Sequence, residues 1–137
     1  MEPYLHTVHY YETDRMGITH HSNYIRWMEE ARIDFLNRIG WSYDKLESMG
    51  IFSPVTAVDC KYRLSTTFAE IIAIHVSVQE FNGVKLVIRY DMYNAQEKLV
   101  CKGHTEHCFL NRDREILRLN RTMPELYDCL RGLIPAE

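Results

Sequence analysis

The feature that most limits the fold is one long amphipathic segment, which is followed by a series of strand-like segments. Apolar residues recur at helical spacing from Tyr24 to Ile39, with Ser22 or Asn23 as a candidate N-cap and Gly40 as a C-terminal stop. The segments rich in β-branched and aromatic residues predict strands over 4–11, 51–62, 70–81, 84–95 and 98–110, and a shorter strand over 116–119. This order predicts an α+β fold, in which a mostly antiparallel sheet packs its apolar face against the helix.

The connections between these segments carry recognisable turn and helix signals. Asn82-Gly83 predicts a two-residue type I′ hairpin turn, because both residues tolerate a positive φ. Polar breaks occur at 94–97 and 111–114, and residues 42–49 read as a short helical or irregular piece. Pro124 is typical of the first turn of a C-terminal helix. We therefore expect strands that are neighbours in sequence to pair as hairpins.

Length and composition favour one globular domain that spans residues 1–137. The chain has 137 residues, 46% of them hydrophobic, and neither a repeat nor a linker divides it. Its longest apolar run, residues 71–74, is far shorter than the roughly 20 residues of a membrane-spanning helix. The first residues show no basic region followed by an apolar one, so we expect a cytoplasmic protein. A net charge of −3 with interspersed signs argues against nucleic acid as the main partner.

Neither the cysteines nor the histidines form a recognisable metal motif. The four cysteines contain no C-x-x-C pair and lie in apolar or strand-like stretches, which predicts reduced, buried thiols. Asp14, His20 and His21 could be taken for metal ligands, but adjacent histidines point apart in most backbone conformations, and no second pair has zinc-site spacing. No serine nucleophile elbow or phosphate-binding loop occurs either. These patterns argue against a metal site, against nucleophilic serine chemistry and against phosphoryl transfer.

The polar segment between the first strand and the helix carries the groups that are best suited to chemistry. Asp14 precedes a turn that contains Gly17, and His21 lies at or just before the helix N-terminus. Backbone N–H groups at that position lack partners and would stabilise an oxyanion. A carboxylate beside such donors suits acyl transfer, in which one group attacks or activates water while another holds the charge on the carbonyl oxygen. Taken alone, the same residues are more often ordinary helix caps.

The pattern of this segment resembles the signature of the 4-hydroxybenzoyl-CoA thioesterase-like family, whose members are hotdog-fold acyl-CoA thioesterases. The matching residues are Tyr11-Glu12-Thr13-Asp14-x-x-Gly17-Ile18-x-x-His21-x-Asn23-Tyr24, followed by Glu29-x-Ala31-Arg32 and later by Gly103-x-Thr105-x-His107-x-Phe109. The resemblance covers nearly the whole chain and departs from the family pattern at Glu12 and His20. It implies an antiparallel sheet wrapped around a long central helix, and no metal or cofactor. It also implies a homodimer with active sites at the interface, often paired into a homotetramer.

The resemblance also assigns roles to individual residues. It implies that the Asp14 carboxylate is the nucleophile or the general base, and that the His21 backbone N–H, with Gly17 in the preceding turn, is the oxyanion donor. The substrate contacts that it suggests are Tyr11, Asn23, Lys85, Arg114 and Arg118, the three basic residues being candidates for the CoA phosphates. A solvated charge on a strand edge is the alternative for each of these three.

The predicted function is hydrolysis of an acyl-CoA thioester to the free acid and CoA. The alternative is a non-catalytic module on the same scaffold that binds acyl-CoA or an acyl-carrier protein, because one fold supports many functions. The presence of Asp14 favours the hydrolase. Acyl-CoA is the expected substrate, and a thioester delivered on acyl-carrier protein stays open.

Overall fold

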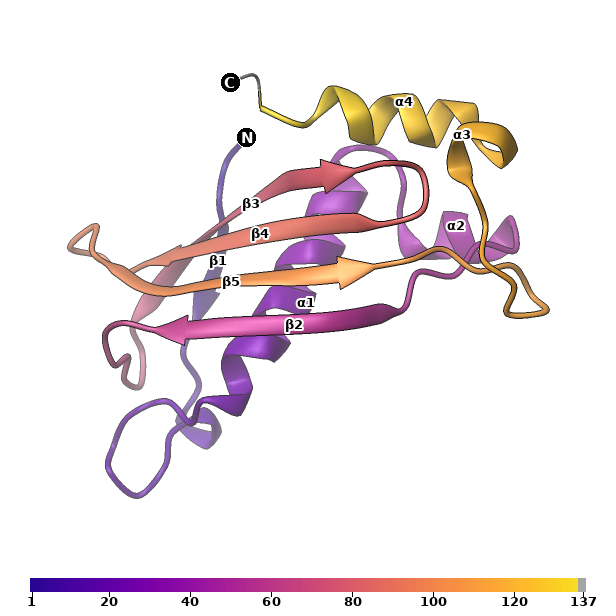
Figure 1. Ribbon diagram of the computed structural model, residues 1–137. Helices are drawn as coiled ribbons and strands as arrows, with labels where there is room; N and C mark the ends of the chain where they lie inside the picture. The colour runs from indigo at the N-terminus through magenta and orange to yellow at the C-terminus, as the bar shows by residue number, and fades with distance from the viewer. Residues whose placement is uncertain (136–137) are drawn as a thin grey trace.

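A five-stranded antiparallel sheet and one long helix form the two layers of the computed structural model, which describes residues 1–135. The strands are β1 (Tyr4–Thr7), β2 (Val55–Tyr62), β3 (Ile71–Phe81), β4 (Leu86–Tyr93) and β5 (Leu99–His107), in the order β1-β3-β4-β5-β2. The helices are the 3₁₀ turn η1 (Tyr10–Glu12), α1 (Ser22–Arg38), α2 (Tyr43–Ser48), α3 (Leu119–Thr122) and α4 (Pro124–Gly132). Figure 1 shows α1 crossing one face of the sheet. The predicted α+β class is confirmed.

The core lies between α1 and the inner face of the sheet. Trp27, Met28 and Ala31 on α1 have no exposed surface, as the helical spacing predicts. Gly103 on β5 has no room for a side chain, because a Cβ atom there would clash with Met28 Cε and lie 2.7 Å from the Asp59 carbonyl oxygen on β2. The absence of a side chain at Gly103 therefore makes room for the Met28 side chain and for the Asp59 backbone of β2.

A chain of buried polar groups crosses this core. Arg32 on α1 donates from Nε to the Tyr43 hydroxyl (2.8 Å) and from Nη1 to the Tyr90 hydroxyl (3.2 Å). Tyr90 contacts Thr105 Oγ1 at 2.8 Å, and Thr105 Oγ1 contacts His107 Nε2 at 2.8 Å. Each hydroxyl can accept one hydrogen bond and donate the next, and among the described residues only His107 Nδ1 is a buried side-chain polar atom without a partner.

The edge strand β2 is unusually exposed for a strand of a packed sheet. Every residue except Cys60 is exposed, and the apolar Val55 and Val58 keep 45% and 43% of their surface in solvent. Ile25 on the neighbouring α1 is 44% exposed. An apolar strip thus remains uncovered along the seam between α1 and β2.

The boundaries of two predicted elements near the N-terminus were wrong. The first strand ends at Thr7 instead of Tyr11, because η1 begins at Tyr10 and the Glu12 N–H bonds the His9 carbonyl. The N-cap of α1 is His21, and no side chain caps it. Gly40 has a φ of +84° after the last turn of α1, so the predicted helix stop is confirmed.

Two further predictions were wrong in detail. Between β3 and β4 only Gly83 has a positive φ, so the connection is not a type I′ turn. Asn82 Oδ1 instead accepts hydrogen bonds from the backbone N–H groups of Val84 and Lys85. Residues 116–119 form no strand: Ile116 makes a single bridge to Leu110, and Leu119 begins α3.

Within residues 1–135, the length and hydropathy of the helices fall short of what a membrane span requires.

Candidate active site

A tight hairpin over residues 13–19 presents the predicted carboxylate. The Asp14 N–H donates to the Ile18 carbonyl (2.8 Å), and the Gly17 N–H donates to the Asp14 carbonyl (3.0 Å). Gly17 has a φ of +80°, which favours glycine at this corner. Asp14 Oδ1 accepts a hydrogen bond from the Met16 N–H at 2.8 Å, whereas Oδ2 has no hydrogen bond to any described residue. One carboxylate oxygen is therefore oriented and the other is free to react.

The start of α1 supplies the predicted donor. His21 is the N-cap, and its backbone N–H makes no hydrogen bond within the described part of the chain. The Tyr62 hydroxyl donates to the His21 carbonyl at 3.3 Å. Burial and the neighbouring Cys60 raise the pKa of Tyr62 to about 12, which keeps this hydroxyl protonated. The unpartnered N–H points from a helix N-terminus, where positive potential favours a developing negative charge.

Asp14 and His21 line the same cavity, which has a volume of about 300 Å³. Its wall consists of Asp14, Met16, Ile18, Thr19, His21, Tyr24, Tyr62, Arg63, Leu64 and Ser65. The sequence analysis missed the wall residues 62–65, since nothing in the pattern of β2 indicates that its C-terminal end lies beside the start of α1. The cavity thus combines a carboxylate, a free N–H donor, an apolar wall and one basic side chain.

The other predicted residues of this segment lie beside the cavity and do not line it. The Tyr11 ring is 79% exposed and stacks on His9. The Asn23 amide donates to the carbonyls of Glu12 (3.0 Å) and His20 (3.2 Å), so both of its hydrogens bind main chain. The Gly17 carbonyl accepts a hydrogen bond from Thr67 Oγ1 at 2.8 Å.

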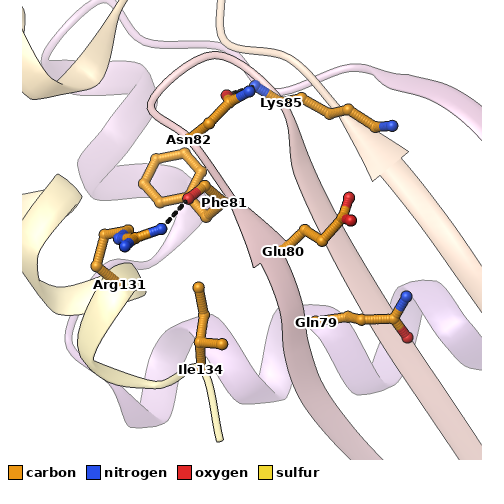
Figure 2. Close-up of a pocket in the computed structure, with 7 residues that line it drawn as sticks. All are labelled: Gln79, Glu80, Phe81, Asn82, Lys85, Arg131 and Ile134. Atoms are coloured by element: carbon orange, nitrogen blue, oxygen red, sulfur yellow. Dashed lines mark hydrogen bonds between the residues drawn. The ribbon is translucent and has the colours of Figure 1, made fainter. Parts of the chain in front are cut away.

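The three predicted phosphate contacts lie elsewhere in the protomer. Lys85 pairs with Glu106 at 3.2 Å and lines a cavity of about 380 Å³ beside α4. Figure 2 shows Arg131 bonding the Phe81 carbonyl in that cavity, while the Lys85 side chain extends away from Arg131. Arg114 lines a cavity of about 480 Å³ near α2, and Arg118 is the N-cap of α3. Figure 1 places these segments at the end of the sheet opposite the α1 N-terminus.

One group of side chains in residues 1–135 has potential metal-ligand atoms close together. His6, His9 and Glu12 bring such atoms within 4.8 Å of one another. His6 Nε2 and Glu12 Oε1 already form a hydrogen bond of 2.9 Å, which a metal ion would have to replace. The candidates considered from sequence, Asp14, His20 and His21, do not form such a group.

Comparison with known proteins identifies the family. The family model described as the thioesterase-like superfamily matches residues 8–128. The chain belongs to this superfamily. Among solved structures, the thioesterase-like chain resembles a DHNA-CoA thioesterase from Staphylococcus aureus, with 30% identity, a TM-score of 0.90 and coverage of 96% of this chain and 89% of that one. The predicted hotdog fold is thereby confirmed.

Two further relatives match along most of their length. The hypothetical protein TT1821 from Thermus thermophilus is 30% identical with a TM-score of 0.88, and the match covers 97% of this chain and 99% of that one. YneP of Bacillus subtilis, provisionally named an acyl-CoA thioesterase, is 33% identical over 106 residues, which is 77% of each chain. The thioesterase-like assignment therefore rests on both sequence and structure.

Proposed function

We propose that the protein hydrolyses acyl-CoA thioesters, with Asp14 and the His21 backbone N–H as the reacting and stabilising groups. The observation that carries the proposal is that a carboxylate with one free oxygen and an unpartnered N–H at a helix start line one cavity. Membership of the thioesterase-like superfamily supports the reaction type. The names of YneP and the Staphylococcus aureus relative point to CoA thioesters as the substrate class.

The chemistry can follow either of two routes. If Asp14 is a general base, it takes a proton from water as the water oxygen attacks the thioester carbon, and the His21 N–H holds the resulting oxyanion. Collapse of this intermediate breaks the C–S bond, and the CoA thiolate is then protonated. If Asp14 is the nucleophile, its oxygen displaces the CoA thiolate to give a mixed anhydride, which water hydrolyses. Both routes require ionised Asp14.

Thiol release from a panel of aliphatic and aromatic acyl-CoAs tests the proposal. We expect turnover of at least one member of the panel. Binding of acyl-CoA without thiol release would support the non-catalytic binding module instead. In a single turnover in ¹⁸O-labelled water, a product acid without solvent label identifies the nucleophilic route in which water attacks the Asp14 carbonyl of the anhydride, whereas the general-base route always places the label in the acid.

We further propose that the protein is a homodimer joined along β2. The exposed Val55 and Val58, together with Ile25 on α1, form an uncovered apolar seam beside an unpaired strand edge. Antiparallel pairing of β2 with its copy about a two-fold axis would extend the sheet and cover this seam. This two-fold axis makes the two sheets run in opposite directions. The end of the sheet that carries Arg114 in one copy would therefore approach the Asp14 cavity of the other copy.

Replacing Val58 with Asp is expected to yield a monomer with little hydrolytic activity, because a charge would be buried in the seam. Sedimentation velocity and thiol release on the same sample measure both effects. Leu5→Asp places the same charge on an apolar residue that is 60% exposed on β1, at the opposite edge of the sheet, and should change neither. A fully active Val58→Asp monomer would contradict the shared site.

The basic residues at the far end of the sheet are expected to bind CoA phosphates in this dimer. Contacts of this kind are exposed and screened over about 10 Å at 0.1 M salt, so Lys85→Ala, Arg114→Ala or Arg118→Ala should raise KM about threefold to fivefold and leave kcat nearly unchanged. Steady-state kinetics at low salt measure the effect. If none of the three changed KM, the nucleotide would lie elsewhere or the acyl group would arrive on acyl-carrier protein.

A further inference from the structure

A network of hydrogen-bonded ionisable side chains lies beside the cavity without lining it. His6 on β1 and Glu12 at the end of η1 are each only 4% exposed. His6 Nε2 lies 2.9 Å from Glu12 Oε1, and His6 Nδ1 lies 3.2 Å from Glu30 Oε1 on α1. The Tyr4 hydroxyl donates to the same Glu30 oxygen at 2.8 Å. The two contacts at opposite ring nitrogens fix the His6 side chain between the strand and the helix.

Glu12 is the centre of this network. Its Oε1 also accepts a hydrogen bond from the His9 N–H (2.8 Å), and its Oε2 accepts one from Trp27 Nε1 (2.7 Å). Burial of Glu12 acts to raise its pKa, but the hydrogen bonds from the His9 backbone, Trp27 and His6 outweigh this effect and lower it. A buried carboxylate with three donors is oriented more firmly than a surface one.

The main chain of Glu12 extends this fixation to the reactive hairpin. The Glu12 carbonyl accepts the His20 N–H at 2.8 Å and the Asn23 side-chain amide at 3.0 Å. Residue 12 therefore joins the chain just before the hairpin of residues 13–19 to the chain just after it, and to the first turn of α1. Asp14 lies two residues from the buried carboxylate, and His21 follows His20 directly.

The hairpin has a second anchor on its return side. The Thr19 N–H donates to the Thr66 carbonyl at 2.8 Å, and Thr67 Oγ1 donates to the Gly17 carbonyl at 2.8 Å. These contacts hold the part of the hairpin that follows Asp14. The entry side is held through Glu12, so loss of its charge would let Asp14 shift while the return side stays in place.

We propose that Glu12 is a positioning residue of the hydrolytic reaction, whose buried carboxylate, bound by His6 and Trp27, sets Asp14 against the His21 N–H. This inference rests on the function proposed above. Glu12 touches no reacting atom and acts through the placement of Asp14. Displacement of a reacting group by about 1 Å can lower a rate by about 10²-fold. Substrate contacts elsewhere in the cavity would not change, so we expect loss of the Glu12 charge to lower kcat and to leave KM nearly unchanged.

The first arm of the test is Glu12→Gln, which keeps the size of the side chain and removes its charge. We expect kcat to fall by about tenfold or more and KM to stay within about twofold of the wild-type value. Trp27→Phe removes one donor and keeps an aromatic ring in the core, and should lower kcat by a smaller factor of about three. Asp34→Asn is the matched control, because Asp34 also lies on α1 but pairs with Arg38 on the surface at 2.9 Å. It should have wild-type kinetics.

The second arm separates positioning from a general structural role. If Glu12 acts through Asp14, adding Glu12→Gln to Asp14→Asn should lower the residual hydrolysis no further, because the group being positioned is already absent. An equal loss in both backgrounds would overturn the proposal, and so would wild-type kcat in Glu12→Gln. If Glu12→Gln does not fold, the same cycle is run with Trp27→Phe, and additive losses there would also overturn it. Full activity of Asp14→Asn alone would refute the assignment of Asp14, and the role of Glu12 with it.

Discussion

Replacing Asp14 with Asn is expected to lower acyl-CoA hydrolysis by about 10²-fold or more while the fold survives. Asn retains the oxygen that accepts the Met16 N–H, so the hairpin keeps its turn. It loses the negative charge that either attacks the thioester or takes a proton from water. Thiol release at saturating substrate measures the loss, and circular dichroism shows whether the structure is kept.

Asp128→Asn on the exposed side of α4 is the control for this change. It removes one carboxylate far along the chain from the cavity and should leave turnover at the wild-type level. Near wild-type turnover of purified Asp14→Asn would show that another group performs the chemistry. If Asp14→Asn is inactive because it does not fold, Asp14→Glu is the second variant to measure. It retains the negative charge and should fold if that charge stabilises the hairpin.

A second large effect is expected from acid, which should lower the free energy of unfolding through His107. This side chain is 1% exposed, and burial followed by the positive charge of Arg32 lowers the pKa of His107 to about 4. In the unfolded chain it would titrate near its usual value of about 6.5. Between these values the unfolded state binds more protons, so stability falls as the pH falls. Over this window the loss from His107 reaches about 3 kcal/mol.

Urea unfolding at several pH values between 7 and 4 measures this contribution. His107→Gln removes the titrating group and should give a shallower fall of the unfolding free energy with acid, while all other carboxylates and histidines contribute equally to both proteins. His75→Gln, at an exposed position on β3, should keep the wild-type slope. Equal slopes for wild type and His107→Gln would show that His107 is not held neutral by the fold.

The order of elements could be predicted from sequence because each depends on a local period. The helical spacing of Tyr24, Met28 and Ala31 and the β-branched and aromatic residues of segment 84–95 are properties of short segments, and the helix and the strand that they predict were confirmed. The wrong predictions occurred where a side chain competes with a standard turn. Asn82 uses its own oxygen to cap the following N–H groups, and Leu119 donates its N–H to the Gly83 carbonyl from more than thirty residues away.

The candidate site shows the same limit. Asp14, Gly17 and His21 lie within eight consecutive residues, so their motif could be read directly. The network of His6, Glu12, Trp27 and Glu30 joins β1, η1 and α1 through individual hydrogen bonds that follow no sequence period. Nothing in the sequence indicates that Glu12 is buried, because a lone glutamate beside tyrosines is usually exposed.

The bare backbone at Gly103 links a position without chemistry to the wall of the candidate cavity. A side chain at residue 103 would meet the Asp59 backbone carbonyl, and relief requires a shift of β2, which ends at Tyr62 in the cavity wall, away from β5. It would also meet the end of the Met28 side chain, which can repack or be replaced. Residues 28 and 103 should therefore vary together among relatives, with a smaller residue at 28 wherever 103 has gained a methyl group.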